Sequence, residues 1–165
     1  MSLVGDIVES YRAPGRVVAR KLADGPREPR ALAILLLACF LIFVSEWPAL
    51  AREAHLDPSI PYDARLGGAL MGTMFILPVL AYLIAAIGHL VVRPLGGQGS
   101  WYGARLALFW AMLAISPLML FQGVVAGMVG PGPALRAVGI VVALAFVWLW
   151  LGGLRAAEKG GQGMP

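Results

Sequence analysis

The chain has 165 residues, of which 59% are hydrophobic and 13% are charged, and its formal net charge is +4. A soluble domain carries about 25% charged residues, so a water-exposed surface of ordinary size cannot be built from this sequence. The basic residues lie beside long apolar runs and form no long basic tract, which argues against a nucleic-acid partner. The composition therefore predicts an integral membrane protein.

Residues 1–30 are polar and basic, and they predict an amphipathic leader that lies on the membrane surface. Pro14 suits the first turn of a second short helix. The apolar residues that recur at helical spacing on one face are Val4, Ile7, Val8 and Tyr11. The basic residues that we expect to contact lipid headgroups are Arg12, Arg16, Arg20 and Lys21. The alternative is a solvated tail that only sets the topology.

Four apolar runs follow, and each is long enough to cross a bilayer. They cover residues 31–50, 66–92, 104–125 and 134–154. Twenty residues at 1.5 Å rise span about 30 Å, the thickness of the hydrocarbon core. The sequence therefore predicts an all-α fold, a polytopic bundle of four transmembrane helices in residues 31–154. A flexible tail is expected at residues 155–165.

Prolines and small residues within these runs suggest where the helices bend and touch. Pro78 and Pro117 each remove a backbone donor, so we expect bends there that face protein rather than lipid. Gly68 and Gly72 have the spacing that favours close contact between helices. Gln122 is expected to hydrogen-bond between helices.

The basic residues are divided unevenly between the two sides of the predicted bundle. Ten of the thirteen lie on the side that carries both termini and the turn between the second and third runs. The positive-inside rule then places both termini in the cytoplasm. Arginine far outnumbers lysine, and alanine and glycine abound, which is typical of GC-rich bacterial genomes. We therefore expect the bacterial cytoplasmic (inner) membrane.

Few polar side chains interrupt the apolar runs. Glu46 lies near the outer end of the first run, where we expect it to snorkel or to pair with Arg52 or Arg65. His89 stands one helical turn before Arg93, near the cytoplasmic end of the second run. His89 and Arg93 are candidates for contact with a lipid phosphate.

A glycine-rich turn joins the second and third runs. Gly96, Gly97 and Gly99 could form a backbone nest for a phosphate. No P-loop lysine and hydroxyl pair follows, however, so a tight turn of permissive backbone is favoured. The sequence contains no recognisable metal-ligand set and no catalytic triad motif. It predicts neither an enzyme nor a cofactor.

Four short motifs follow one another in an order that points to a known family. They are Tyr-Arg-Ala-Pro at residues 11–14, Leu-Gly-Gly-Gln-Gly-Ser at 95–100, Ser-Pro at 116–117 and Trp-Leu-Trp-Leu-Gly-Gly-Leu at 148–154. Together they resemble the YIP family of Ypt/Rab-interacting membrane proteins, in its bacterial branch, over most of residues 8–160. Members of that family typically have five spans, whereas this sequence predicts four.

In eukaryotes the family is linked to Rab GTPases, a partner that a bacterial member should lack. The resemblance therefore implies a non-catalytic membrane scaffold or accessory subunit. Its expected partners are anionic membrane lipids and other membrane proteins or a second copy of the chain. The alternative is a small transporter or lipid-moving protein with a site near the helix breaks at Pro78 and Pro117.

Overall fold

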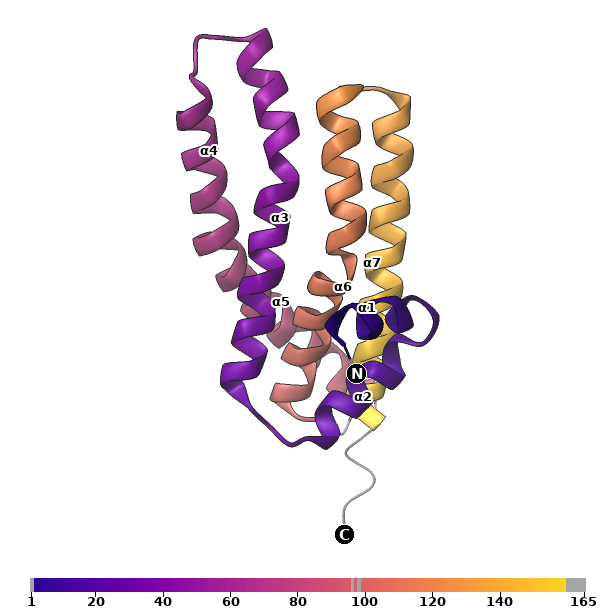
Figure 1. Ribbon diagram of the computed structural model, residues 1–165. Coiled ribbons are helices and arrows are strands. Elements are labelled where there is room, and N and C mark those ends of the chain that lie inside the picture. Colours follow the sequence, from indigo (N-terminus) through magenta and orange to yellow (C-terminus); the bar gives the residue numbers. More distant parts are fainter. Residues whose placement is uncertain (1, 96, 98, 160–165) are drawn as a thin grey trace.

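The computed structural model describes residues 2–95, 97 and 99–159, and almost all of them are helical (Figure 1). Two short helices, α1 (Leu3–Arg12) and α2 (Pro14–Ala23), precede four long helical columns. The first column is α3 (Glu28–Leu56), and the second joins α4 (Tyr62–Met71), η1 (Gly72–Ile76) and α5 (Leu77–Val92). After a short turn, η2 (Arg93–Leu95), the last two columns are α6 (Trp101–Met128) and α7 (Pro133–Lys159).

Each of the four columns is long and apolar enough to cross a bilayer, which confirms the predicted all-α polytopic bundle. The helices extend beyond the predicted spans because their polar ends continue the helix outside the hydrocarbon layer. Helix α7 continues to Lys159, so residues 155–159 are helical rather than part of a flexible tail. Residues 160–165 of that predicted tail lie outside the described residues.

The centre of the bundle is the first half of α6. Nearly every side chain from Tyr102 to Ser116 is buried, and Phe109 and Trp110 are the largest of them. Helix α3 packs against this segment through a stripe of small and branched residues: Ala31, Leu35, Ala38, Cys39 and Ile42. In a bilayer such contacts stabilise the fold through close packing rather than through the exclusion of water.

Beyond Ser116, α6 touches α3 through two glycines. A Cβ atom at Gly123 would collide with the carbonyl oxygen of Ser45, and one at Gly127 would lie 2.8 Å from that of Pro48. The close helix contact predicted at Gly68 and Gly72 is not made with any of the described residues, since a Cβ atom at either would meet nothing within 4 Å. The small-residue contact therefore belongs to α3 and α6, where the two backbones meet.

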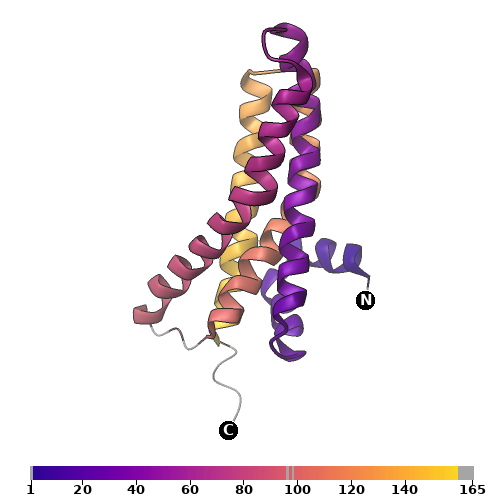
Figure 2. The ribbon, with the colours of Figure 1, turned by 90° about the vertical axis from the view of Figure 1, so that its left-hand side faces the viewer.

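The helix break at Pro78 is confirmed. The π-helical turn η1 directly precedes it, so Pro78 lies in the first turn of α5, where its missing N–H breaks no bond. Figure 2 shows the second column changing direction in this region. Pro78 itself is half-buried.

Helix α6 also changes direction in its middle, near Pro117 (Figure 1). The hydroxyl of Ser116 donates to the carbonyl of Leu113 at 2.8 Å. The expectation that Pro117 faces protein is wrong, because its ring is exposed where the buried segment of α6 ends. Pro48 is a third proline within a helix, and there the Ser45 hydroxyl donates to Ile42 in the same manner.

The leader forms two helices that meet at Pro14, as predicted. Helix α1 runs across the long axis of the bundle (Figure 2), and α2 packs against the end of α7. The α2 contact is close, since a Cβ atom at Gly15 would lie 3.0 Å from the carbonyl oxygen of Gly152. Val17 and Val18 are buried beneath it.

Candidate functional site: a groove within the bundle

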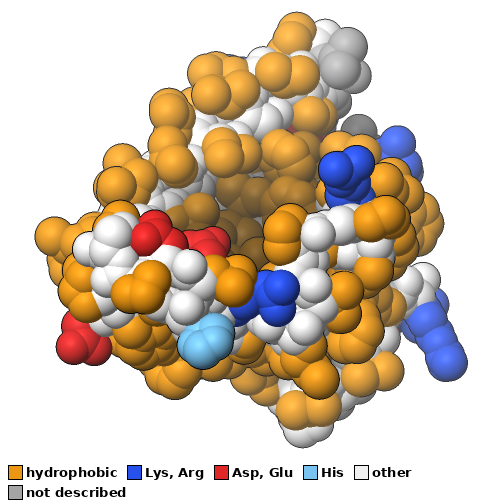
Figure 3. Space-filling model, turned by 90° about the horizontal axis from the view of Figure 1, so that it is seen from above, with side chains coloured by type: hydrophobic (Ala, Val, Ile, Leu, Met, Phe, Trp, Pro, Cys, Tyr) orange, Lys and Arg blue, Asp and Glu red, His pale blue; other side chains and the backbone are white. Residues whose placement is uncertain are grey.

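A groove of about 670 Å³ opens between the second and fourth columns. Residues of α4, η1 and α5 form one wall, α7 forms the other, and α6 lies between them with part of α3. Viewed from above, the hollow is walled by hydrophobic side chains, and both acidic and basic side chains lie around its rim (Figure 3). The lining is apolar except for Glu46, the Thr73 hydroxyl and the indole of Trp150.

Both helix breaks border this groove. The π-helical turn contributes Gly72, Thr73 and Ile76, and Ile115 and Met119 flank Pro117 on α6. The second column (Figure 2) and α6 (Figure 1) both change direction next to residues that line the groove. The two helix breaks that the sequence predicted thus border one cavity.

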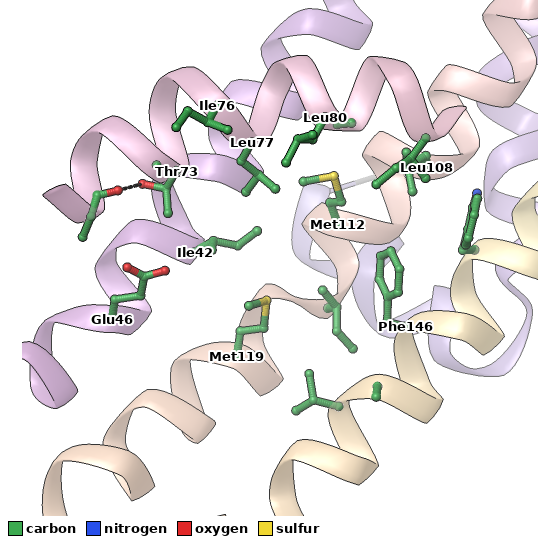
Figure 4. Close-up of a pocket in the computed structure, with 18 of the residues that line it drawn as sticks. Ile42, Glu46, Thr73, Ile76, Leu77, Leu80, Leu108, Met112, Met119 and Phe146 are labelled. Atoms are coloured by element: carbon green, nitrogen blue, oxygen red, sulfur yellow. Dashed lines mark hydrogen bonds between the residues drawn. The ribbon is translucent and has the colours of Figure 1, made fainter. Parts of the chain in front are cut away.

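Glu46 is the one charged side chain among the described residues that line the groove, and Figure 4 shows it at the same end as Thr73. The Thr73 hydroxyl donates to the carbonyl of Ala69 at 2.8 Å. Within the part of the chain that the structure describes, Glu46 has no hydrogen-bond or ion-pair partner. Glu46 is half-buried. Moving a charged group out of water without a partner is unfavourable, and in membrane proteins such groups commonly mark function.

The predicted pairing of Glu46 with Arg52 or Arg65 is wrong. Arg52 follows Glu46 by six residues, which turns it to another face of the helix, and its Nη1 atom lies 3.4 Å from the carbonyl oxygen of Gly127. Arg65 instead binds Glu53 at 3.1 Å and Asp57 at 3.4 Å. Both cations are therefore held outside the groove.

A second polar cluster fixes the leader to the bundle. Lys21 is buried, with its Nζ atom 2.7 Å from Asp6 Oδ2 and 4.0 Å from the centroid of the Trp110 ring. The Trp110 indole donates to Ser10 Oγ at 2.8 Å. Burial opposes ionisation of Asp6, but the hydrogen bond and charge of Lys21, together with Arg20, lower the pKa of its carboxyl group.

This cluster changes the prediction that four basic residues of the leader face lipid headgroups. Lys21 points inward, and Arg20 binds Asp6 at 2.7 Å and Glu9 at 3.0 Å. Arg12 and Arg16 are exposed, although Arg16 lies 3.9 Å from Glu9. The sequence pattern did not separate these roles because the acidic partners lie on the other helix of the leader.

A third cluster lies at the end of the bundle that carries the glycine-rich turn. His89 is buried, and its Nδ1 atom lies 3.0 Å from Glu158 Oε1. The backbone N–H of Gly99 donates to Glu158 Oε2 at 2.8 Å. The carboxylate of Glu158 thus takes the place that the sequence suggested for a phosphate. Gly96, the first glycine of the predicted nest, lies outside the described residues.

His89 therefore does not serve as an open headgroup contact. Arg93 remains exposed, beside a hollow of about 320 Å³ that His89, Gly97, Gly99 and Trp101 also line. Sequence reasoning missed Glu158 because it assigned that residue to the tail. The feature of the sequence that could have pointed to Glu158 is its position, four residues after the end of the fourth apolar run.

The Gln122 amide lies between α6 and α7, where a Cβ atom at Gly139 would be 3.5 Å from its nitrogen. Its side chain makes no hydrogen bond within the described residues, so its contact with α7 is one of packing. The predicted interhelical hydrogen bond of Gln122 is thus not made within the chain.

Four apolar columns that enclose a groove, with polar clusters at one end, define a polytopic helical membrane protein. A family model described as the Yip1 domain matches residues 8–163, nearly the whole chain. The chain belongs to that family, as the order of its motifs predicted. A search of curated proteins and a search of solved structures each returned no match.

Proposed function

We propose that this chain is a non-catalytic membrane protein that holds the apolar chain of a lipid in the groove between α5 and α7. The observation that carries the proposal is the groove itself. Its volume of about 670 Å³ falls within the range of about 300–1,000 Å³ typical of small-molecule sites. Its lining is almost entirely apolar, and it opens within the part of the protein that spans the membrane.

Close packing rather than exclusion of water drives binding inside a bilayer. A lipid chain therefore prefers the groove to bulk lipid only where the walls touch it on several sides. The groove meets this requirement because the second column, α6 and α7 all contribute to its walls. Its position beside both helix breaks favours the lipid-handling alternative that the sequence left open.

A pair of substitutions on α7 tests the proposal. Ala143 lines the groove, whereas Ala137 is exposed on the same helix and does not line it. Ala143→Phe should project a ring into the groove and obstruct it, and native mass spectrometry after gentle extraction should then show less lipid on this variant than on the parent protein. Ala137→Phe should retain the lipid. Equal lipid retention by both variants would contradict the proposal.

A scaffold or accessory role is the second candidate, and the exposed outer helices favour it. We compare the most apolar 18-residue segment of each span. In α6, 56% of that segment is buried inside the protein, whereas the buried share is 17% in the second column and 22% in α7. These faces are available to another membrane protein or to a second copy of the chain. Cross-linking in native membranes, followed by identification of the linked chains, tests this role. Linked chains bound through α5 or α7 are expected.

For the membrane itself, we propose the bacterial inner membrane with both termini in the cytoplasm. The support is the ten-to-three division of basic residues between the two ends of the bundle. Anionic lipids are the proposed partners of Arg12, Arg16 and Arg93, the three candidate headgroup contacts that remain exposed.

A further inference from the structure

We infer that Glu46 selects the ligand of the groove, and that this ligand is a long-chain amphiphile with a hydroxyl or ammonium headgroup and no phosphate. The inference rests on the proposed function, because it requires that the groove hold an apolar chain. It adds the chemistry of the headgroup, which the apolar walls alone do not specify.

The first step of the argument is the missing partner of Glu46. Its carboxyl group lines a mostly apolar groove, and both arginines that the sequence offered as partners bind elsewhere. A carboxyl group in such a place is stabilised by a donor, either an ammonium or a hydroxyl group. Since the described residues supply none, the ligand is the natural source of that donor.

The second step excludes a phosphate. Among the described residues that line the groove, none is a lysine, an arginine or a histidine. A phosphate beside Glu46 would place two negative groups together in a medium of low dielectric constant, without a cation between them. Arg52 follows Glu46 by six residues, so the two residues are about 9 Å apart along the axis of α3. A headgroup at Glu46 therefore lies deeper in the groove than Arg52.

The third step is the polarity of the groove along its length. Glu46 and Thr73 lie at one end of the groove, and Leu108 lies at the other (Figure 4). Ile84 follows Thr73 by eleven residues along the second column, and it shares a neighbouring apolar hollow with Trp150. On α7 the lining runs from Gly139 to Trp150, eleven residues that extend about 16 Å. One polar end and a long apolar remainder match an amphiphile whose head lies at Glu46 and whose tail points toward Trp150.

The test uses three probes of equal chain length that differ only in the headgroup: ω-bromo-undecylamine, ω-bromo-undecanol and ω-bromo-undecanoic acid. Bromine quenches tryptophan fluorescence at short range, so a tail that reaches Trp150 reports its own binding. The full-length protein is placed in nanodiscs of phosphatidylcholine, and the variant Trp150→Phe identifies the signal from that residue. The amine and the alcohol should quench Trp150 at concentrations about tenfold lower than the acid.

The variant Glu46→Gln should abolish most of the preference for the amine over the acid. Glu53→Gln is the matched control, because Glu53 lies on the same helix, is exposed and does not line the groove. The control should keep the preference of the parent protein. Since the preference is also measured on the parent protein, the result does not depend on whether the variant folds.

The outcomes separate the two proposals. If no probe quenches Trp150, the lipid-binding function itself fails. If all three probes quench it alike in the parent protein, the groove binds chains but Glu46 does not select a headgroup, and only this inference is overturned. The inference is also overturned if Glu46→Gln leaves the probe preference intact. If this variant then also abolishes cross-linking between two chains, Glu46 serves a contact between proteins instead.

Discussion

At the scale of single residues, two basic side chains of the leader, Arg20 and Lys21, bind acidic residues of α1 instead of extending toward the surroundings. The Lys21 Nζ and Asp6 Oδ2 atoms are 2.7 Å apart, and both side chains are buried. The ammonium group of Lys21 also lies against the face of the Trp110 ring. Removal of one member of a buried pair leaves the other charge without compensation, which typically destabilises a protein by about 3–5 kcal/mol. The pair joins α1 to α2, and Lys21 links both of them to Trp110 of the bundle, so we expect its loss to weaken the attachment of the leader.

We predict that Asp6→Asn releases the leader. Trypsin should then cut within α2, after Arg20 or Lys21, on the order of a hundredfold faster, as expected for a loss of about 3 kcal/mol. Asp63→Asn makes the same change at an exposed position on α4 and should leave the cleavage rate unchanged. Cleavage mapped by mass spectrometry measures both, and equal rates would show that the pair does not hold the leader.

The same pair predicts a dependence on pH. Because the folded protein lowers the pKa of Asp6 below its ordinary value of 3.8, the stabilisation is present above that value. It is lost as the pH falls below 3.8 through the lowered pKa. Protease protection of α2, measured with pepsin from pH 5 downward, should decline in this window for the parent protein. The Asp6→Asn variant should show no such decline.

At the scale of helices, the position of a glycine decides its importance. Gly123 lies against the backbone of α3, whereas Gly68 faces open space on α4. The two residues have the same chemistry and both lie inside membrane helices. Their different surroundings provide a direct test of the packing between α3 and α6.

We predict that Gly123→Ala destabilises the protein by about 1–3 kcal/mol, because the added methyl group forces α3 and α6 apart. Gly68→Ala should be neutral or should stabilise by about 0.5–1 kcal/mol, since alanine is the better helix former. Thermal unfolding of both variants in one detergent measures the difference. Equal midpoints would mean that the two helices do not pack as closely as the structure has them.

At the scale of the whole molecule, the charge asymmetry makes a prediction about orientation. Ser2 lies at the end of the bundle that carries the leader, and Ser59 lies in the exposed loop between α3 and α4 at the other. The single native cysteine, Cys39, is buried and should give little background labelling.

A membrane-impermeant maleimide added to intact bacterial spheroplasts should therefore label the Ser59→Cys variant. It should label the Ser2→Cys variant only after lysis, as expected for a cytoplasmic N-terminus. Labelling of Ser2→Cys before lysis, with Ser59→Cys protected, would reverse the proposed orientation.

The sequence by itself determined the features that depend on neighbouring residues. Hydrophobic runs of sufficient length predicted the four spans. The prolines at positions 14 and 78 predicted the division of the leader and the wide turn before α5, because proline acts on the backbone within one turn of itself. The order of short motifs predicted the family, which the match over residues 8–163 then showed.

Only the tertiary structure decided which distant groups meet. Glu158 binds His89 across 69 positions of the chain, and Trp110 binds Ser10 across 100. No local pattern encodes such pairs, so sequence reasoning assigned His89 and Lys21 to lipid and predicted the close helix contact at Gly68 and Gly72. Glu46 shows the same limit: the helix turns it away from Arg52 and into the groove, and Arg65 binds Glu53 and Asp57 instead.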